Sequence, residues 1–436
     1  MSQRQLQRYH LIRMVIEGKV SLAQAAEVMQ VSYRQAKRIK AHVDAEGASG
    51  VLHHNRGRIP ANKLPDEVHQ QVQELSQGRY ALFNDTHFTE LLAEREGIEV
   101  SRETVRQWRR EGGQPPKRPR RLSQRHHKRR ERKPAEGMMM LWDGSPHRWF
   151  GPDRPPCCMM AGIDDATSQV LAIHFLPVET SAAYLILLRL VLQRRGTPCS
   201  VYQDRHSALK RNDSHWSLQE QLNGRQEPTQ VGAALEALGI ETIFALSPEA
   251  KGRIERLNGT LQDRLAALLA LDGITDAAAA NAYADAGFID DHNRRFAELA
   301  QDPTPAWRKL PRGMELDRVL SFRYSAVVNQ DNTVRLGGQV LDIPPGPRGC
   351  GYAKQVVEVR QLLDGRWRIY HGDKLLGEYP ATPVGEPLRR RKRHPHAPGA
   401  DEAEWVYLGS APAEERPAVG RATRNPGGGI RASRIA

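Results

Sequence analysis

The apolar pattern of the chain changes at Gly137, and this change constrains the fold more than any other sequence feature. Before Gly137 the apolar residues recur at helical spacing, whereas after it short β-like runs alternate with helical segments. We read as strands the runs "MMMLWDG", "PCCMMAGIDDATSQVLAIHFLP" (two strands), "PCSVYQD" and "IETIFAL". Between them, "TSAAYLILLRLVLQRRG" predicts a helix capped by Thr180 or Ser181. This alternation favours an α/β domain inside a multidomain chain, since 436 residues allow about three domains.

Three carboxylates lie at strand ends or on a helix of this α/β pattern. Asp143 lies near the end of the first strand, and Asp204 ends "PCSVYQD". Glu255 lies in "SPEAKGRIERLNGTLQDRL", which begins as a helix with Ser247 as cap and Pro248 at the first helical position. Apolar residues at helical spacing form the core stripe of that helix: Ile254, Leu257, Leu261, Leu265 and Leu268. Glu255 is about 100° away from Ile254 around the axis, so we expect it at the polar rim.

If folding gathers Asp143, Asp204 and Glu255, their mutual repulsion needs compensation. Two divalent cations, Mg²⁺ or Mn²⁺, would supply it, and two metal ions also suit phosphodiester displacement. Polar residues beside Glu255 would then hold the DNA backbone: Lys251, Arg253, Arg256 and Asn258. The alternative is that these are ordinary solvated helix residues. Asp164 and Asp165, between two strand-like runs, are interpreted as turn formers, and His206 as a candidate for positioning substrate.

The N-terminal third predicts two all-α, helix-turn-helix DNA-binding units. In residues 1–55, Ser21 and Ser32 can cap successive helices, with Leu22, Ala25, Ala26 and Met29 facing inward. The outward candidates for DNA contact on the third helix are Arg34, Lys37 and Arg38. In residues 60–112, Ser101 can cap "RETVRQW", which would turn Arg106 and Arg109 outward. A plain three-helix bundle with a charged face is the alternative for each unit.

Positive charge is concentrated in two segments that cannot form a core. The formal net charge of the chain is +13, and residues 117–133, inside a linker at 113–136, hold ten Lys/Arg and one Glu. So dense a run favours contact with phosphates, although a solvated linker or a targeting signal would share its composition. The DNA-contact candidates here are Arg120, Arg121, Lys128, Arg129 and Arg130. Residues 386–436 form a second basic segment, expected to be disordered.

The C-terminal third, the cysteines and the apolar runs complete the predicted domain organisation. Residues 315–385 alternate between apolar and polar positions and contain Asp-Asn, Gly-Gly and Asp-Gly turns, which predicts a small SH3-like β-barrel. The four cysteines lack zinc-site spacing. No apolar run approaches the roughly 20 residues of a membrane span, and the N-terminus does not resemble a signal peptide. We therefore expect no membrane partner and a cytoplasmic, nucleoid-associated bacterial protein.

Four motifs carry a family resemblance: "LWDGSPHRWF", "GIDDATSQVLAIHF", "VYQDRHSAL" and "SPEAKGRIERLNGTLQDRL". With them, residues 137–312 resemble the catalytic core of bacterial insertion-sequence transposases of the Asp-Asp-Glu, retroviral integrase-like superfamily, most closely the ISNCY-type group. The resemblance implies a ribonuclease-H-like fold with Asp143, Asp204 and Glu255 as catalytic metal ligands. It also implies metal-dependent hydrolysis at transposon ends, strand transfer into target DNA, and a homodimer or larger assembly on the terminal inverted repeats.

The sequence departs from familiar members of that superfamily in three ways. Arg205–His206–Ser207 replaces the usual Asn-Gly after the second aspartate, and an insertion at 211–230, expected to be a loop, lengthens the interval from Asp204 to Glu255. A His-His-Cys-Cys zinc module is also missing from the N-terminus. None of these removes a carboxylate. Two alternatives remain open: a non-catalytic, transposase-derived DNA-binding regulator, and a nuclease that cuts without joining.

Overall fold

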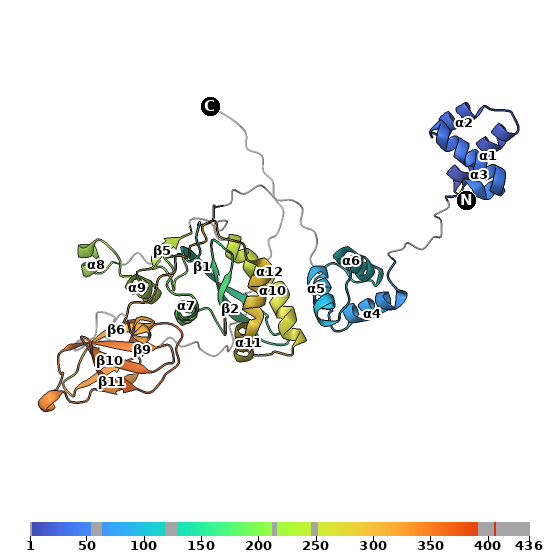
Figure 1. Ribbon diagram of the computed structural model, residues 1–436. Coiled ribbons are helices and arrows are strands. Elements are labelled where there is room, and N and C mark those ends of the chain that lie inside the picture. Colours follow the sequence, from blue (N-terminus) through green and yellow to red (C-terminus); the bar gives the residue numbers. More distant parts are fainter. Residues whose placement is uncertain are drawn as a thin grey trace, which may run out of the picture. The chain divides into compact units, whose positions relative to one another are not determined.

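The computed structural model describes residues 2–53, 63–117, 130–211, 216–245, 252–390 and 405–406 (Figure 1). The chain divides into two compact units. One consists of Met1–Gly78 and Leu91–Gln114, and the other of Arg79–Glu90 and Pro115–Ala436. Among the described residues, none of the helices is both long and apolar enough to span a bilayer.

The first helical group follows the predicted helix-turn-helix pattern. It consists of α1 (Gln3–Ile16), α2 (Leu22–Val28), α3 (Tyr33–Glu46) and the 3₁₀ turn η1 (Gly47–Val51). The hydroxyls of Ser21 and Ser32 accept hydrogen bonds from the backbone N–H groups three residues on, which confirms both predicted caps. The buried core of the group contains Ile12, Ala25, Ala26, Met29, Ala36, Ile39 and Val43.

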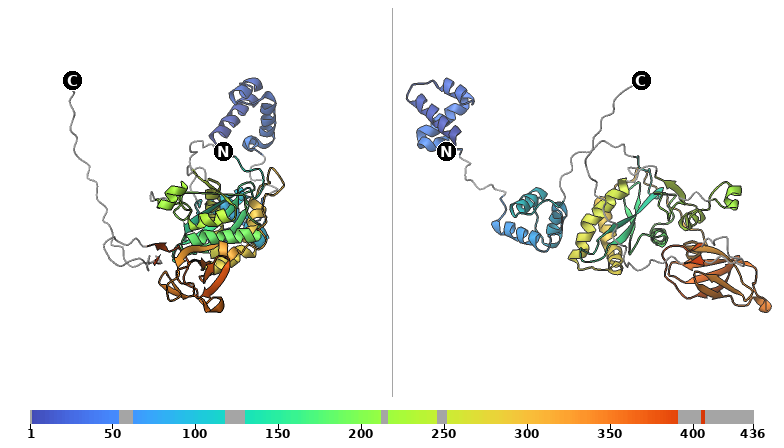
Figure 2. Two further views of the ribbon diagram at one scale, coloured as in Figure 1. Left: turned by 90° about the vertical axis from the view of Figure 1, so that its left-hand side faces the viewer. Right: turned by 180° about the vertical axis from the view of Figure 1, so that it is seen from behind.

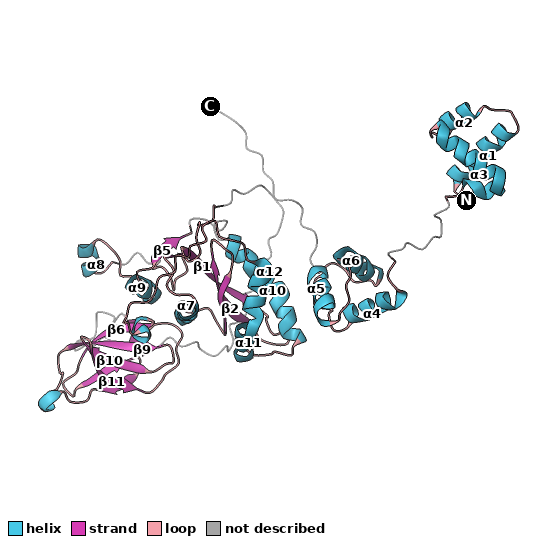
Figure 3. Ribbon diagram, in the orientation of Figure 1, coloured by secondary structure: helices cyan, strands magenta, loops and turns pink. Residues whose placement is uncertain are grey.

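The second helical group contains α4 (Asp66–Gln77), α5 (Asp85–Arg95) and α6 (Arg102–Glu111). Helix α5 crosses the boundary between the two units, which falls after Glu90. The hydroxyl of Ser101 accepts a hydrogen bond from the N–H of Thr104, as the sequence predicts for the start of α6. Figure 3 shows both groups as helices joined by loops.

The centre of the second unit is a mixed five-stranded sheet in the order β3-β2-β1-β4-β5. Its strands are β1 (Met139–His147), β2 (Cys157–Asp164), β3 (Val170–Leu176), β4 (Ser200–Gln203) and β5 (Glu241–Phe244). The first three strands pair antiparallel, whereas β4 pairs parallel with both β1 and β5. All the strands expected from the sequence are therefore present, joined by the predicted turn between β2 and β3.

Helices cover both faces of this sheet (Figures 1 and 2). Alternate side chains of β1 enter different cores, because successive residues of a strand point to opposite faces. Met140 and Trp142 pack with α7 (Ser181–Arg194) and α9 (Gln230–Ala237). Met139 and Leu141 pack on the other face with α10 (Gly252–Leu271), α11 (Ala277–Tyr283), the π-helical turn η3 (Ala284–Phe288) and α12 (Ile289–Phe296). The predicted core stripe of α10 is buried throughout.

The insertion at 211–230 is not wholly a loop. Its described part contains the short helix α8 (Leu218–Asn223), which begins with a capping box between Ser217 and Glu220. The insertion is so polar that its composition does not predict a helix. The local sequence signal for the start of α8 was the capping pattern Ser-x-x-Glu at 217–220. The predicted start of α10 at Ser247 and Pro248 lies outside the described residues.

The C-terminal segment is β-rich, but the expected barrel is not confirmed. After α13 (Leu316–Val319), four strands form an antiparallel sheet in the order β11-β10-β9-β6. These are β6 (Ser321–Val327), β9 (Val356–Leu362), β10 (Trp367–His371) and β11 (Lys374–Tyr379). The strands β7 (Thr333–Leu336) and β8 (Gln339–Asp342) form a separate hairpin, the turn η4 spans Pro347–Gly349, and β12 (Arg389–Arg390) pairs with β13 (Trp405–Val406). Within the described residues the four-stranded sheet stays open, because β6 and β11 each pair with one strand only.

Candidate active site

Asp143 and Asp204 lie on neighbouring strands at equivalent positions. The parallel pairing of β1 and β4 aligns Leu141 with Tyr202, and each aspartate is two residues further along its own segment. Side chains two residues apart share a face, so both aspartates lie on the side of the sheet where Leu141 and Tyr202 pack beside α10. Neighbouring strands are about 4.8 Å apart. The register therefore puts Asp143 and Asp204 at equivalent positions of neighbouring segments, with Asp204 one residue beyond the end of β4.

Helix α10 is tied to this pair through Asn258. The amide Nδ2 of Asn258 donates to Oδ2 of Asp143 over 3.4 Å, and one turn further Gln262 Nε2 donates to Ser145 Oγ over 3.0 Å. Glu255 is exposed and lies three residues before Asn258, a spacing that puts both residues on one side of the helix. The third predicted carboxylate is thus carried by the helix that contacts Asp143.

These residues do not form a finished metal site. Within the described ranges, no three acidic, histidine or cysteine side chains lie close enough together to hold a metal ion. The β1–β4 register puts Asp143 and Asp204 at equivalent positions, and the described residues contain no group of three carboxylates that joins them with Glu255. The donors themselves fit Mg²⁺ or Mn²⁺, because carboxylate and amide oxygens are the hard ligands that these ions prefer.

A fourth carboxylate, Glu179, lies beside β1 next to Asp143, and the sequence analysis missed it. A Cβ atom on Gly144 would lie only 2.1 Å from Oε2 of Glu179, so the carboxylate occupies the space beside the residue that follows Asp143. The hydroxyl of Tyr184 donates to Oε1 of Glu179. Burial raises the pKa of Tyr184, and the negative charges of Glu179, Asp143 and Asp204 raise it further. The one sequence signal for this contact is the glycine directly after Asp143.

The loop after β4 binds Asp204 from its own backbone. The N–H of His206 donates to Oδ1 of Asp204 over 2.9 Å. The ring Nδ1 of His206 lies 4.0 Å from Oε1 of Glu179, at the outer limit of an ion pair, and 3.4 Å from the N–H of Ala208. His206 thus lies between Asp204 and Glu179, while its role toward substrate stays a prediction.

Two of the arginines proposed to contact DNA are engaged by a buried acid. The side chains of Arg130 and Arg253 both bind the carboxylate of Asp165, which is fully buried, and Arg253 also donates to the carbonyl of Arg130 over 2.6 Å. Burial lowers the pKa of Arg253, and the charge of Asp165 opposes this shift. These two guanidinium groups therefore stabilise the protein itself, and they are less available to phosphates than the sequence suggested.

Asp164 has the structural role that the sequence indicated. Its carboxylate accepts hydrogen bonds from the backbone of Gly137 and from both the N–H and the hydroxyl of Thr167. Burial raises its pKa, and these hydrogen bonds lower it again. Both Asp164 and Asp165 belong to the turn region between β2 and β3, which supports their interpretation as turn formers.

The expected outward position of Arg109 is wrong. Its side chain is 5% exposed, and its Nε donates to Oε1 of Gln114 over 3.0 Å. The reason is helical spacing, because Arg109 follows the buried Val105 by four residues and shares its inward face. Arg106 is exposed as expected, but its guanidinium pairs with Glu103.

The remaining candidates for DNA contact are divided between exposed, buried and undescribed positions. Arg34, Lys37 and Arg38 are exposed on α3, and Arg256 is exposed beside Glu255 on α10. Asn258 is only 8% exposed and faces Asp143 instead of solvent. Five candidates lie outside the described residues: Arg120, Arg121, Lys128, Arg129 and Lys251.

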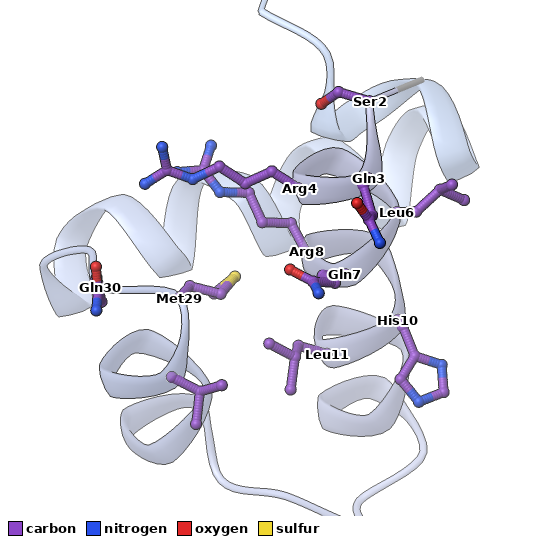
Figure 4. A pocket seen from close by; sticks show the side chains of 11 residues that line it. Ser2, Gln3, Arg4, Leu6, Gln7, Arg8, His10, Leu11, Met29 and Gln30 are labelled. Atoms are coloured by element: carbon purple, nitrogen blue, oxygen red, sulfur yellow. The ribbon is translucent and has the colours of Figure 1, made fainter.

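A basic pocket in the first helical group was also missed. It is lined by α1 and by the end of α2, and Figure 4 shows the guanidinium groups of Arg4 and Arg8 side by side at its edge. The Nε of Arg8 is buried and has no hydrogen-bond partner among the described residues. Two neighbouring cations with an unsatisfied donor are suited to bind an anion such as phosphate. The i, i+4 spacing of the two arginines was the available sequence signal.

Sequence comparison relates the chain to one helix-turn-helix family and to two transposases. The family model described as winged helix-turn helix matches residues 8–70. A protein of Sinorhizobium fredii (strain NBRC 101917 / NGR234), named as the transposase y4bF, is 38% identical over 369 residues, which cover 84% of this chain and 78% of that protein. The transposase for insertion sequence IS1202 of Streptococcus pneumoniae is 28% identical over 433 residues, which cover 90% and 91% of the two chains.

Solved structures show remote likeness. The integrase catalytic core domain of HTLV-2 in complex with magnesium is 15% identical, with a TM-score of 0.25, and the match covers 34% of this chain and 83% of that one. The intasome of simian T-cell lymphotropic virus, in complex with a PP2A regulatory subunit, is 13% identical, with a TM-score of 0.29 and coverages of 73% and 100%. Both likenesses are too weak to assign residue roles, which depend here on the geometry of the chain itself.

Proposed function

Because the chain belongs to the transposases of bacterial insertion sequences, we propose that it binds the terminal inverted repeats of its element, hydrolyses a phosphodiester bond at each end and transfers the freed strand into target DNA. One observation carries the catalytic part of this proposal. The register of β1 and β4 pairs Leu141 with Tyr202, so that Asp143 and Asp204 each follow two residues later, and Asn258 ties α10 to Asp143. The strand order β3-β2-β1-β4-β5 also supports a ribonuclease-H-like core.

Asp143, Asp204 and Glu255 are the residues that would hold two divalent ions, Mg²⁺ or Mn²⁺. Bound there, the ions would supply charge neutralisation for the attacking and leaving oxygens of the phosphodiester. Neighbouring groups of the chain hold the two aspartates in place, since Asn258 orients Asp143 and the N–H of His206 orients Asp204. Glu255 is exposed in the first turn of α10, where it can approach the aspartates without repacking the core.

DNA binding is assigned to surfaces outside the carboxylates. Arg34, Lys37 and Arg38 project from α3, the helix that enters the major groove in helix-turn-helix proteins. Arg4 and Arg8 would bind phosphates beside that groove. Arg256, exposed next to Glu255, would hold the backbone of the strand being cut. Since a transposase must hold two ends, we also propose a homodimer or larger assembly on DNA.

The test is a strand-transfer assay with Mg²⁺, a DNA duplex bearing the terminal inverted repeat, and a supercoiled target plasmid. We expect joined products from the wild-type chain and none from Asp143→Asn, Asp204→Asn or Glu255→Gln. Each of these three variants should still bind the duplex, because none of them changes the helical groups. The matched controls are Asp290→Asn and Glu236→Gln, which remove exposed carboxylates far from Asp143 in sequence and should transfer strands normally.

The same assay separates the alternatives. Cleavage without joined products would indicate a nuclease, and duplex binding with neither cleavage nor joining would indicate a regulator. Undiminished cleavage by any one of the three carboxylate variants would exclude that residue from the active site.

A further inference from the structure

A buried polar connection lies behind the two aspartates, on the opposite face of the sheet. Trp142 and Gln203 are the residues directly before Asp143 and Asp204, so their side chains point to the face covered by α7. The indole Nε1 of Trp142 donates to Oε1 of Gln203 over 2.9 Å. Trp142 is 1% exposed and Gln203 is fully buried. This hydrogen bond joins β1 to β4 beyond the last paired position of their backbones.

Tyr184 of α7 packs on Trp142 and also links it, through Glu179, back to β1 at Gly144. The rings of Trp142 and Tyr184 pack edge to face with their centroids 5.1 Å apart. The hydroxyl of Tyr184 donates to Glu179, whose other carboxylate oxygen fills the space beside Gly144. We name this set of four residues the Glu179 brace: Glu179, Tyr184, Trp142 and Gln203. Through it, the residues before and after Asp143 and the residue before Asp204 are fixed to one helix.

We propose that the Glu179 brace positions the two aspartates as metal ligands by fixing the separation and direction of β1 and β4 just beyond their last paired residues. This inference rests on the proposed function, because it assigns the brace to the metal site of that reaction. None of its four residues needs to touch DNA or metal. They are positioning residues, and Gly144 is a glycine because any larger side chain would displace Glu179.

The chemistry of the ions makes the proposal specific. Mg²⁺ requires near-ideal octahedral geometry and short metal–oxygen distances of about 2.0–2.1 Å, so a small shift of two ligands weakens it strongly. Mn²⁺ accepts the same oxygen ligands and is larger, so it should tolerate the shift better. Loss of the brace should therefore change the preference between the two ions. A general loss of stability would not have that effect.

The test uses the full chain without DNA and measures binding of Mg²⁺ and of Mn²⁺ by titration calorimetry. Tyr184→Phe removes only the hydroxyl that contacts Glu179, and Glu179→Ala removes the carboxylate. Loss of residues that orient metal ligands lowers metal affinity by about 10–100-fold. We expect a loss in that range for Mg²⁺ in both variants and a clearly smaller loss for Mn²⁺. Glu236→Gln, which removes one exposed carboxylate from α9, should bind both ions as the wild type does.

Asp143→Asn separates the failure of this inference from the failure of the proposed function. If Asp143→Asn loses metal binding while Tyr184→Phe and Glu179→Ala bind Mg²⁺ normally, the brace has no positioning role and only the inference fails. An equal loss of Mg²⁺ and Mn²⁺ in the brace variants would also overturn it. If Asp143→Asn binds Mg²⁺ as the wild type does, the proposed metal site fails as well. Should Glu179→Ala not fold, Tyr184→Phe alone decides the result.

Discussion

The close approach of Gly144 and Glu179 allows a quantitative test of the site geometry by Gly144→Ala. The added methyl group would lie 2.1 Å from Oε2, 2.5 Å from Cδ of Glu179 and 3.1 Å from Sγ of Cys158. Gly144 is not among the glycines with positive φ, so backbone strain does not contribute to the effect. The substitution tests one contact, between β1 and Glu179, which lies two residues before α7.

The free-energy cost of Gly144→Ala depends on the atoms that the added methyl group must displace. Forcing extra volume into a packed site costs about 1–3 kcal/mol. In a Glu179→Ala background the two nearest atoms are gone and only the contact with Cys158 remains, so Gly144→Ala should then cost less than about 1 kcal/mol. The resulting coupling free energy is about 1–2 kcal/mol, within the range for residues in direct contact.

Hydrogen exchange of the native full chain, followed on peptides that cover β1, is the suitable assay. It reports local opening free energies, whereas a single unfolding transition is not expected of a chain with two units. Gly259→Ala is the control, because a Cβ there meets nothing within 4 Å and a helical Gly→Ala change should stabilise by roughly 0.5–1 kcal/mol. An equal cost of Gly144→Ala with and without Glu179 would refute the contact.

Three further predictions concern other parts of the chain. Burial and the charges of Arg264 and Arg295, which both pair with Glu90, lower the pKa of His292 from 6.5 to about 4. The unfolded chain therefore binds the proton first as pH falls below 6.5, and His292→Gln should remove about 2.5 kcal/mol of the acid destabilisation at pH 4.5, measured by hydrogen exchange of peptides that cover α12; an unchanged pH dependence would contradict this. Asp165→Asn removes the carboxylate that binds two partly buried arginines and should cost about 2–4 kcal/mol in hydrogen exchange of α10, and a cost below about 1 kcal/mol would exclude a stabilising role. Neutralising the arginines of 117–133 should flatten the salt dependence of DNA binding, and an unchanged slope would show that this run does not contact phosphate.

Local signals in the sequence predict most of the α/β core. Serine and threonine caps mark helix starts, and the apolar stripe of α10 identifies its buried face. The buried run before Asp204 correctly places this residue just after a strand, whereas the expected strand end near Asp143 is wrong, because β1 stays paired with β2 as far as His147. Their exact alignment, however, depends on the register between β1 and β4, which no local pattern encodes.

The Glu179 contact and the ion pairs of Asp165 were missed because they depend on residues distant in sequence. Glu179 is 35 residues from Gly144, and the glycine alone does not indicate which residue fills the space beside it. Arg130 and Arg253 look like solvated cations until the fold places both beside the buried Asp165. Whether the C-terminal strands close into a barrel likewise depends on pairing between the first and last strands, and turn signals alone do not determine it.

Anomalous scattering from Mn²⁺, measured on crystals of the chain with a duplex of its terminal repeat, tests the central claim most directly. We expect Mn²⁺ peaks between Asp143 and Asp204, with a carboxylate oxygen of Glu255 among the ligands. Peaks elsewhere, or peaks held by the two aspartates with Glu255 directed away from them, would contradict the proposed metal site.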